Sequence, residues 1–347
     1  MPEIRRAEQH KKPGVYYAVT DEGLELPIVD VTHPAFQTTL TDAKQQTLTR
    51  HFLAEQRRFA RLPSWLRWAM MRFFTRGSLI ARGLRRAEGS FLDGMTTYLF
   101  KLGPNNLGSY AVPVDRRILS SLPALSVQLR LFDMARLLAD GLAPRLAADL
   151  GRPLQLVNIA GGPAIDSLNA LICLRQEQPA LLAQRRITLC VLDGDEHGPA
   201  FGARALTALQ APGAPLAGLE IAFSRRRYDW SDVAELESVL ETAKREGSVL
   251  AVSSEGGLFE YGSDQDILAN LRALPCDQNA FVVGSVTRDD ELIQTLKLTS
   301  TAATQPRGLP VFTALIAKAD WNVTRAITRP LSDQVLLERP ARPSSPA

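Results

Sequence analysis

From residue 154 onward, short apolar runs alternate with segments of helical periodicity, and this alternation limits the fold more than any other feature of the chain. A run that is apolar at nearly every position fits a strand buried on both faces, as in a parallel sheet covered by helices. Five such runs predict strands, at 154–160, 187–193, 219–224, 249–254 and 280–286. The alternation of these strands with helices predicts an α/β domain.

The end of the chain departs from this alternation. The runs at 321–327 and 334–339 flank the turn sequence TRPLSD, which predicts an antiparallel hairpin. With the five preceding strands, the hairpin gives a seven-stranded, mostly parallel sheet. The polar, proline-rich tail 341–347 is expected to be disordered.

Local signals predict where several helices begin and end. Ser231 is expected to cap a helix over 231–244, and Ser263 to cap a second helix that Pro275 stops. Residues 41–150 have helical periodicity and few strand signals, with a loop around 102–113. The chain is therefore expected to divide into a mainly helical region, 1–150, and an α/β domain, 151–340.

Positive charge is concentrated in one segment. The net charge is only +3, yet ten arginines face two glutamates between Arg50 and Glu88. This stretch is interpreted in three ways: a helical layer with a solvated basic face, a lid that attracts an acidic substrate or carrier, or a helix on a membrane surface. The membrane alternative rests on the aromatic residues Trp65, Trp68, Phe73 and Phe74. Nucleic acid is not expected, because no binding module accompanies the arginines.

Several classes of protein are not expected. No apolar run reaches the roughly 18 residues of a membrane span, and the first residues lack the apolar stretch of a secretory signal, so a cytoplasmic protein is predicted. Cys173, Cys190 and Cys276 are far apart in apolar contexts, as expected of buried thiols in a reducing compartment. With four histidines and no metal-ligand spacing, no metal is expected.

The sequence VNIAGGPAIDSL, which joins the first predicted strand to a helix, carries most of the functional argument. Small residues let the chain turn sharply and let backbone N–H groups approach a ligand. The helix that follows directs its positive end at the same place. Ligands of open α/β sheets bind at the carboxyl ends of strands, so this turn predicts a cofactor site. The dinucleotide fingerprint G-x-G-x-x-G is absent from it.

The turn resembles the first motif of class I S-adenosylmethionine (SAM)-dependent methyltransferases, an acidic residue followed by x-G-x-G-x-G. Asn158 stands at the acidic position, where its amide oxygen could still accept a hydrogen bond. The resemblance implies a Rossmann-like sheet with SAM as cofactor. It also implies that the turn's cofactor-binding residues are Asn158, Ala160, Gly161, Gly162, Pro163, Ala164 and Ser167.

Later segments extend the resemblance over residues 150–340. It implies that Asp193, at the end of the second strand, binds the ribose hydroxyls, with Asp195 as its alternative. A carboxylate suits this role because it can accept two hydroxyl protons. The segment Tyr228, Asp229 and Trp230 would lie near the adenine. After the fourth strand, Ser254 and Glu255 would face the methyl group and the acceptor.

The implied activity is methyl transfer to a small, natural-product-like acceptor, with 1–150 covering the substrate and 151–340 binding SAM. Such a displacement depends mainly on alignment, and a general base is needed only for an acceptor that stays protonated. Candidate bases are Glu255, His33 and His197, and Tyr261 is a candidate to orient the acceptor. The run Asp195, Glu196, His197 is interpreted as a solvated turn rather than a metal site.

Two other functions stay open. A nucleotide-linked oxidoreductase, using NAD or a flavin, could use the same type of sheet. A SAM-fold protein that has lost activity and serves as a partner is the alternative outside catalysis, kept open by Asn158. Assembly as a homodimer and peripheral contact of residues 50–88 with a membrane are also open.

Overall fold

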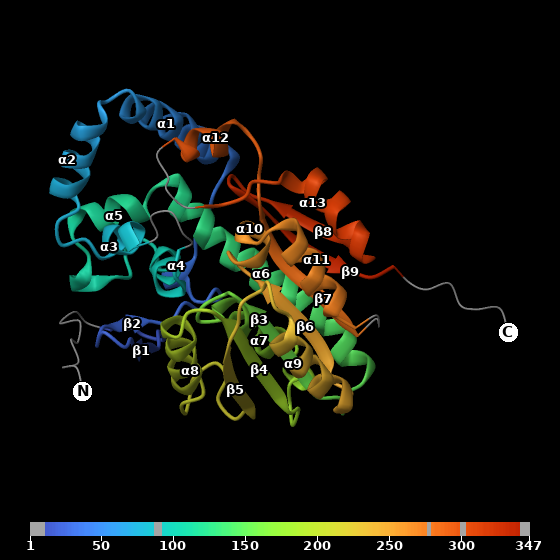
Figure 1. The fold of residues 1–347 in the computed structure, drawn as a ribbon. Coiled ribbons are helices and arrows are strands. Elements are labelled where there is room, and N and C mark those ends of the chain that lie inside the picture. Colours follow the sequence, from blue (N-terminus) through green and yellow to red (C-terminus); the bar gives the residue numbers. More distant parts are fainter. Residues whose placement is uncertain (1–10, 87–91, 276–278, 299–302, 341–347) are drawn as a thin grey trace.

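The computed structural model describes residues 11–86, 92–275, 279–298 and 303–340. Cys276 and the predicted disordered tail 341–347 lie outside these residues. Seven strands form one sheet in the order β5-β4-β3-β6-β7-β9-β8 (Figure 1). Their bounds are β3 Leu154–Ile159, β4 Ile187–Asp193, β5 Ile221–Arg227, β6 Val249–Ser254, β7 Ala280–Thr287, β8 Asn322–Thr328 and β9 Ser332–Glu338. The pairs β7–β9 and β8–β9 are antiparallel and the others parallel, which confirms the predicted fold class.

The third predicted strand, 219–224, was placed wrongly. The observed strand β5 covers Ile221–Arg227, and Leu219 lies in the preceding turn, where its N–H donates to the carbonyl of Leu216. Because β5 is an edge strand, most of its second half is exposed and carries the polar sequence SRRR. Apolarity therefore does not mark its end.

Two helical layers cover the sheet, and the side chains of each central strand point alternately into them. Leu154 and Leu156 of β3 pack into one core, with helices α6 (Leu122–Ala148), α7 (Ile165–Glu177) and α8 (His197–Leu209). Val157 and Ile159 pack into the other core, with α9 (Ala234–Arg245), α11 (Asp264–Ala273) and α13 (Gly308–Ile316). Figure 1 shows α9, α11 and α13 on one side of the sheet. The short helices α10 (Leu258–Tyr261) and α12 (Glu291–Lys297) follow β6 and β7.

One of the two predicted caps is confirmed. The Ser263 hydroxyl accepts a hydrogen bond from the Asp266 N–H at the start of α11. The Ser231 prediction was wrong, since α9 begins at Ala234. The N–H and hydroxyl of Ser231 both donate to the Asp229 carboxylate, so Ser231 belongs to a local turn that precedes the helix.

The N-terminal region is mostly helical, as predicted, after a small hairpin of β1 (Tyr17–Val19) and β2 (Glu25–Pro27). Its helices are α1 Asp42–Ala60, α2 Ser64–Phe74, α3 Leu79–Arg86, α4 Gly94–Leu102 and α5 Pro113–Leu119. Helices α1 and α2 form an arch beyond the carboxyl edge of the sheet (Figure 1). Helix α6 precedes the predicted domain boundary at residue 150, yet it packs on the sheet that follows it. One core therefore contains residues from both sides of that boundary, and the division into two domains stays a prediction. Among the described residues, no helix has both the length and the apolarity needed to cross a membrane.

Candidate functional site

The strand order reverses at the centre of the sheet, where β3 lies between β4 and β6. The connection after β3 leads to β4 on one side, whereas β6 pairs with β3 on the other. A crevice for a ligand is expected outside the carboxyl ends of strands at such a reversal. Three segments meet there: the turn Ala160–Ala164 follows β3, Asp193 is the last residue of β4, and Glu255 follows β6.

The turn after β3 has a strained backbone. Ala160, Gly162 and Ala164 have positive φ angles of 53°, 59° and 53°. A left-handed conformation costs a residue with a Cβ about 1–2 kcal/mol, so two alanines hold this shape only because their surroundings impose it. The N–H of Ala160, for example, donates to the carbonyl of Leu192 in β4. Strain of this kind concentrates at binding and catalytic sites.

Asn158 braces the turn from below. Its side chain is fully buried; Nδ2 donates to Asp166 Oδ1 and to Ser253 Oγ, each at 2.9 Å. Its Oδ1 accepts from the N–H of Gly161 at 3.0 Å. A methyl group on Gly161 would lie 2.3 Å from that oxygen, so only glycine fits there. Asn158 therefore positions the turn and has both ends of its amide occupied.

Asp193 ties the end of β4 to the same turn. Its carboxylate accepts from the N–H of Gly162 and from the N–H of Asp195, both at 2.9 Å. Burial raises the pKa of Asp193 to about 6, against the lowering effect of these hydrogen bonds. Asp195 in turn accepts from the N–H groups of His197 and Gly198 at the start of α8. The two candidate ribose ligands thus lie together beside the turn.

Two helices begin directly on the turn. A methyl group on Gly94, the first residue of α4, would lie 2.7 Å from the Cα of Gly162. One on Gly198 of α8 would lie 2.9 Å from the same atom. Backbone touches backbone on both sides of Gly162, so the turn is closed in this arrangement.

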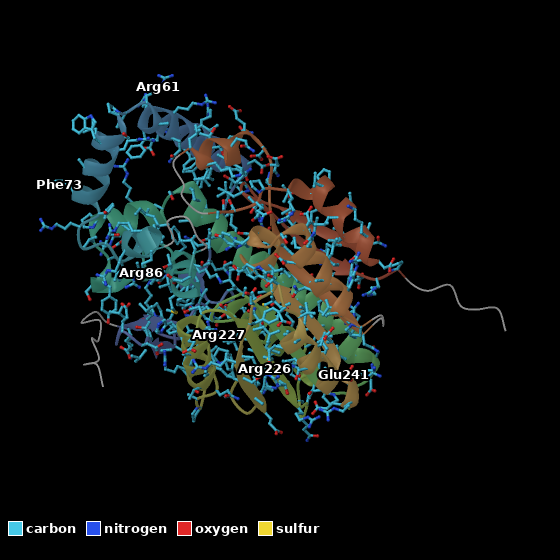
Figure 2. All side chains as sticks on the ribbon, viewed as in Figure 1. Arg61, Phe73, Arg86, Arg226, Arg227 and Glu241 are labelled. Carbon is cyan, nitrogen blue, oxygen red and sulfur yellow. The ribbon has the colours of Figure 1, made fainter. Side chains whose placement is uncertain are left out.

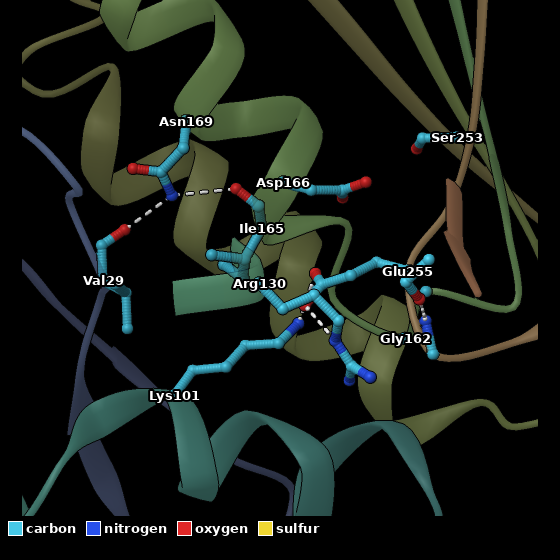
Figure 3. Close-up of polar contacts among 12 residues, drawn as sticks. Val29, Lys101, Arg130, Gly162, Ile165, Asp166, Asn169, Ser253 and Glu255 are labelled. Atoms are coloured by element: carbon cyan, nitrogen blue, oxygen red, sulfur yellow. Dashed lines mark hydrogen bonds and ion pairs between the residues drawn. The ribbon is translucent and has the colours of Figure 1, made fainter. Parts of the chain in front are cut away.

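A buried network of charges lies beside the turn, at the end of β6 (Figure 3). Glu255 accepts from Lys101 Nζ at 2.8 Å and from Arg130 Nε at 3.3 Å. Arg130 Nη1 also donates to Glu260 Oε1 at 2.8 Å, and Ser285 Oγ donates to the same oxygen. The side chains of Lys101 and Glu255 are each 1% exposed. Glu255, a candidate base, therefore has both carboxylate oxygens in contact with basic side chains.

Asp166, on the first turn of α7, has an unsatisfied oxygen. Its Oδ1 accepts from Asn158, whereas Oδ2 has no hydrogen-bond partner among the described residues. Complete burial, with a smaller contribution from the charge of Glu255, raises the pKa of Asp166 to about 6, although Lys101 and hydrogen bonding from the Ser253 hydroxyl and the Ser167 backbone oppose the shift. An orphaned carboxylate oxygen is costly, and such exceptions are often found at functional sites.

The residues predicted near the adenine follow β5. The Tyr228 hydroxyl donates to Asn270 Oδ1 at 2.6 Å, and burial raises the pKa of that phenol above its usual range. Asn270 also donates to the carbonyl of Trp230, whose ring is half-buried against the second core. Asp229 is exposed and binds Ser231. Tyr228 thus anchors this loop, and Trp230 is its partly accessible aromatic side chain.

Two serines predicted at the cofactor site are buried. Ser254 Oγ accepts from the N–H of Leu258, the first residue of α10. Ser167 Oγ lies 3.4 Å from Ser253 Oγ, beneath the turn. Both side chains support the backbone around the crevice.

The histidines predicted as bases lie in local contacts. His33 Nδ1 accepts from the N–H of Ala35 and its Nε2 lies 3.1 Å from the carbonyl of Pro13. His197, at the start of α8, has a side chain that is 71% exposed and bonded to Asp21. That hydrogen bond is the main cause that raises the pKa of His197.

Tyr261 is the only one of the four predicted catalytic residues that lines the large cavity of this protein. Burial raises the pKa of its phenol to about 12, so it is a neutral hydrogen-bonding group at ordinary pH. The cavity has a volume of about 2180 Å³ and lies between the arch and the ends of β6 and β7. Its floor includes Gly256, Glu260 and Thr287.

Sequence reasoning missed Lys101, Arg130 and Asp166. Asp166 is part of the quoted turn sequence, and an acid four residues after two glycines was a signal that could have been used. Lys101 lies in α4 and Arg130 in α6, both far in sequence from Glu255. No local sequence pattern indicates that either side chain is buried.

A scan against protein-family models gives no match, and a search of curated proteins gives no relative. A search of solved structures finds magnesium protoporphyrin IX methyltransferase from Synechocystis PCC 6803 with bound S-adenosylhomocysteine (SAH), at 13% identity and TM-score 0.44, covering 71% of this chain and 94% of that one. It also finds the pyocyanin biosynthetic protein PhzM, at 14% identity and TM-score 0.38, with coverages of 65% and 59%. LepI in complex with SAM matches at 17% identity and TM-score 0.36, covering 58% of this chain. The chain spans about half of LepI, 46% of its length.

Proposed function

We propose that the protein is a SAM-dependent methyltransferase that acts on a small-molecule acceptor. The observation that carries the proposal is the strained small-residue turn at the strand-order reversal, bonded through Gly162 to Asp193 at the end of the next strand. A turn of small residues, a helix N-terminus and a carboxylate are the groups that a nucleoside-bearing cofactor requires.

The residues around the turn match the chemistry of SAM. Asp193 would accept hydrogen bonds from the ribose hydroxyls, and Trp230 would lie against the adenine. SAM carries positive sulfonium and ammonium groups, and the buried Asp166, whose Oδ2 has no hydrogen-bond partner among the described residues, would supply a negative charge once the turn opens. SAM supplies an electrophilic methyl group. Since Gly94 lies on Gly162, binding requires α4 to move off the turn.

The side chains of this chain would act mainly by positioning. Methyl displacement needs alignment of donor and acceptor, which can contribute about 7–11 kcal/mol in well-oriented cases. Tyr261 would donate or accept a hydrogen bond at the acceptor. Glu255 would hold the cavity floor through Lys101 and Arg130 rather than remove a proton, because both of its oxygens are buried and already paired with these side chains.

A catalytically inactive SAM-fold partner is the second candidate. The closed contact of Gly94 with Gly162 favours it, because both the turn and Asp193 are already satisfied within the protein. Contact with a membrane through the arginine-rich segment and assembly as a homodimer stay predictions that are independent of this choice.

Isothermal titration of the purified protein with SAM and with SAH tests the proposal. We expect micromolar binding that Asp193→Ala weakens at least tenfold, about 1.4 kcal/mol. Glu241→Ala, which removes an exposed acid on α9, serves as the matched control and should leave affinity unchanged. Because Asp193 also holds the turn, Asp193→Asn and a thermal unfolding curve separate lost affinity from lost structure.

Each outcome of the titration has a clear meaning. Failure of the intact protein to bind SAM or SAH overturns the proposal, and titration with NAD(H) and flavins then tests the oxidoreductase alternative. Binding without turnover on any acceptor favours the inactive partner.

A further inference from the structure

The large cavity is too big for an ordinary small ligand. Its volume of about 2180 Å³ exceeds the roughly 300–1,000 Å³ of most small-molecule pockets. Much of its wall is apolar and aromatic. The walls include Phe52 and Phe59 of α1, Leu62, Phe73 of α2, Leu84 of α3 and Phe100 of α4. A ligand that fills this space must therefore present a large apolar surface.

The same walls carry an excess of positive charge. Arg58, Arg67, Arg76 and Arg85 line the cavity from α1, α2 and α3 and the turn between them. Among the described residues, no ion pair joins any of these four to an acid, although Arg85 donates to Thr75. The two acids of the lining, Glu55 and Glu260, are already paired with Arg117 and Arg130.

This arrangement differs from a basic surface that only confers solubility. Other arginines of the segment, such as Arg61 and Arg82, do not line the cavity, whereas the four above line one apolar space from separate elements. Figure 2 marks Arg61 and Phe73 on the arch and Arg86 at the end of α3. An excess of positive charge beside apolar walls raises the local concentration of an anionic ligand.

We propose that this cavity binds an anionic amphiphile, a molecule with a long or multi-ring apolar body and a carboxylate or phosphate head. The apolar body lies against the phenylalanines, and the head pairs with these four arginines. The floor of the cavity reaches Gly256, Tyr261 and Thr287 at the ends of β6 and β7. If the methyltransferase proposal holds, on which this last step rests, the amphiphile is the methyl acceptor.

Binding of defined amphiphiles to the full chain tests the inference without any cofactor. Monomeric laurate should displace the dye anilinonaphthalene sulfonate from one saturable site. The displacement is measured as a loss of dye fluorescence. Dodecanol and dodecyltrimethylammonium, which keep the chain length but lose or reverse the charge, should bind at least tenfold more weakly. Myristate, with two more methylenes, should bind roughly tenfold more tightly than laurate. Lauryl phosphate in place of laurate identifies the preferred head, and tight binding of either supports the inference.

A matched pair of variants shows whether the cavity is responsible. The double variant Arg67→Gln, Arg76→Gln should weaken laurate at least tenfold, whereas Arg61→Gln, Arg82→Gln should change it less than twofold. All four positions are at least partly exposed, so both proteins should unfold at the temperature of the parent. Equal affinities in the two double variants, or no preference for laurate over dodecanol, would overturn the inference.

Two further measurements distinguish this inference from membrane binding and from the methyltransferase proposal. Sedimentation with phosphatidylglycerol vesicles in the absence of saturable laurate binding overturns the inference and favours a membrane surface instead. SAM titration of the same preparation distinguishes failure of the cavity inference from failure of the methyltransferase proposal. Laurate binding without SAM binding supports the amphiphile site alone, and SAM binding without laurate binding rejects it while the methyltransferase proposal stands.

Discussion

Replacing Asp166 by asparagine should stabilise the protein above pH 6. The carboxylate is fully buried with one oxygen unpartnered, and its pKa is raised from 3.8 to about 6. A rise of about two units corresponds to ~3 kcal/mol lost from the free energy of unfolding when the group is ionised. Asparagine keeps the oxygen that accepts from Asn158 and carries no charge to bury. We therefore expect a gain of about 2–3 kcal/mol.

The gain should depend on pH in a defined direction. Because the pKa of Asp166 is higher in the folded than in the unfolded protein, the folded state binds more protons between about pH 4 and pH 6, and the penalty grows as the pH rises through that window. Below pH 4 the carboxyl group is neutral in both states and the penalty vanishes. Urea unfolding of Asp166→Asn and the parent should differ most at pH 8 and converge towards pH 4.

Asp115 provides the control for this substitution. It is also fully buried, but its carboxylate accepts from the Ser78 hydroxyl and from the N–H groups of Ile80 and Val112. Asp115→Asn should therefore destabilise the protein. A loss of stability in Asp166→Asn at pH 8, or a difference from the parent that does not change with pH, would refute the electrostatic reasoning.

Two further substitutions test the core of the site. Gly161→Ala should lower the free energy of unfolding by about 1–3 kcal/mol, because its methyl group would meet the Asn158 oxygen at 2.3 Å; a urea midpoint equal to the parent's would contradict the close approach. Lys101→Met should cost on the order of 3 kcal/mol, because it leaves the buried Glu255 short of one cation. The surface variant Lys11→Met, whose side chain is 55% exposed, should cost less than about 1 kcal/mol. Equal urea midpoints for the two lysine variants would show that the buried pair adds nothing.

The parts of the fold that could be predicted are those fixed by local pattern. The central strands are apolar on both faces because both are covered by helices, so β3, β4, β6 and β7 were readable from the sequence. Strand β5 lies at the edge of the sheet, where exposed positions need not be apolar, so its end has no apolar pattern. The Ser231 cap was wrong because Ser231 forms a turn with Asp229, two residues earlier, and the helix begins only at Ala234.

The small-residue turn was predictable, but its closure was not. Nothing in the sequence around Gly94 distinguishes it from an ordinary helix start, and its contact with Gly162 joins residues 68 positions apart. The buried network escaped prediction for the same reason. Lys101 and Glu255 are separated by 154 positions and Arg130 and Glu255 by 125, so their pairing depends on tertiary packing alone.

Helix α4 connects the two regions for which we propose ligands. Its first residue, Gly94, lies on the turn after β3, and its other end places Lys101 against Glu255 beneath the cavity. Phe100, on the same helix, lines that cavity. A nine-residue helix is about 13 Å long and moves as one piece, so displacing Gly94 from the turn also disturbs the pairing of Lys101 or the wall at Phe100. Opening of the turn and the shape of the cavity are therefore coupled through one rigid element.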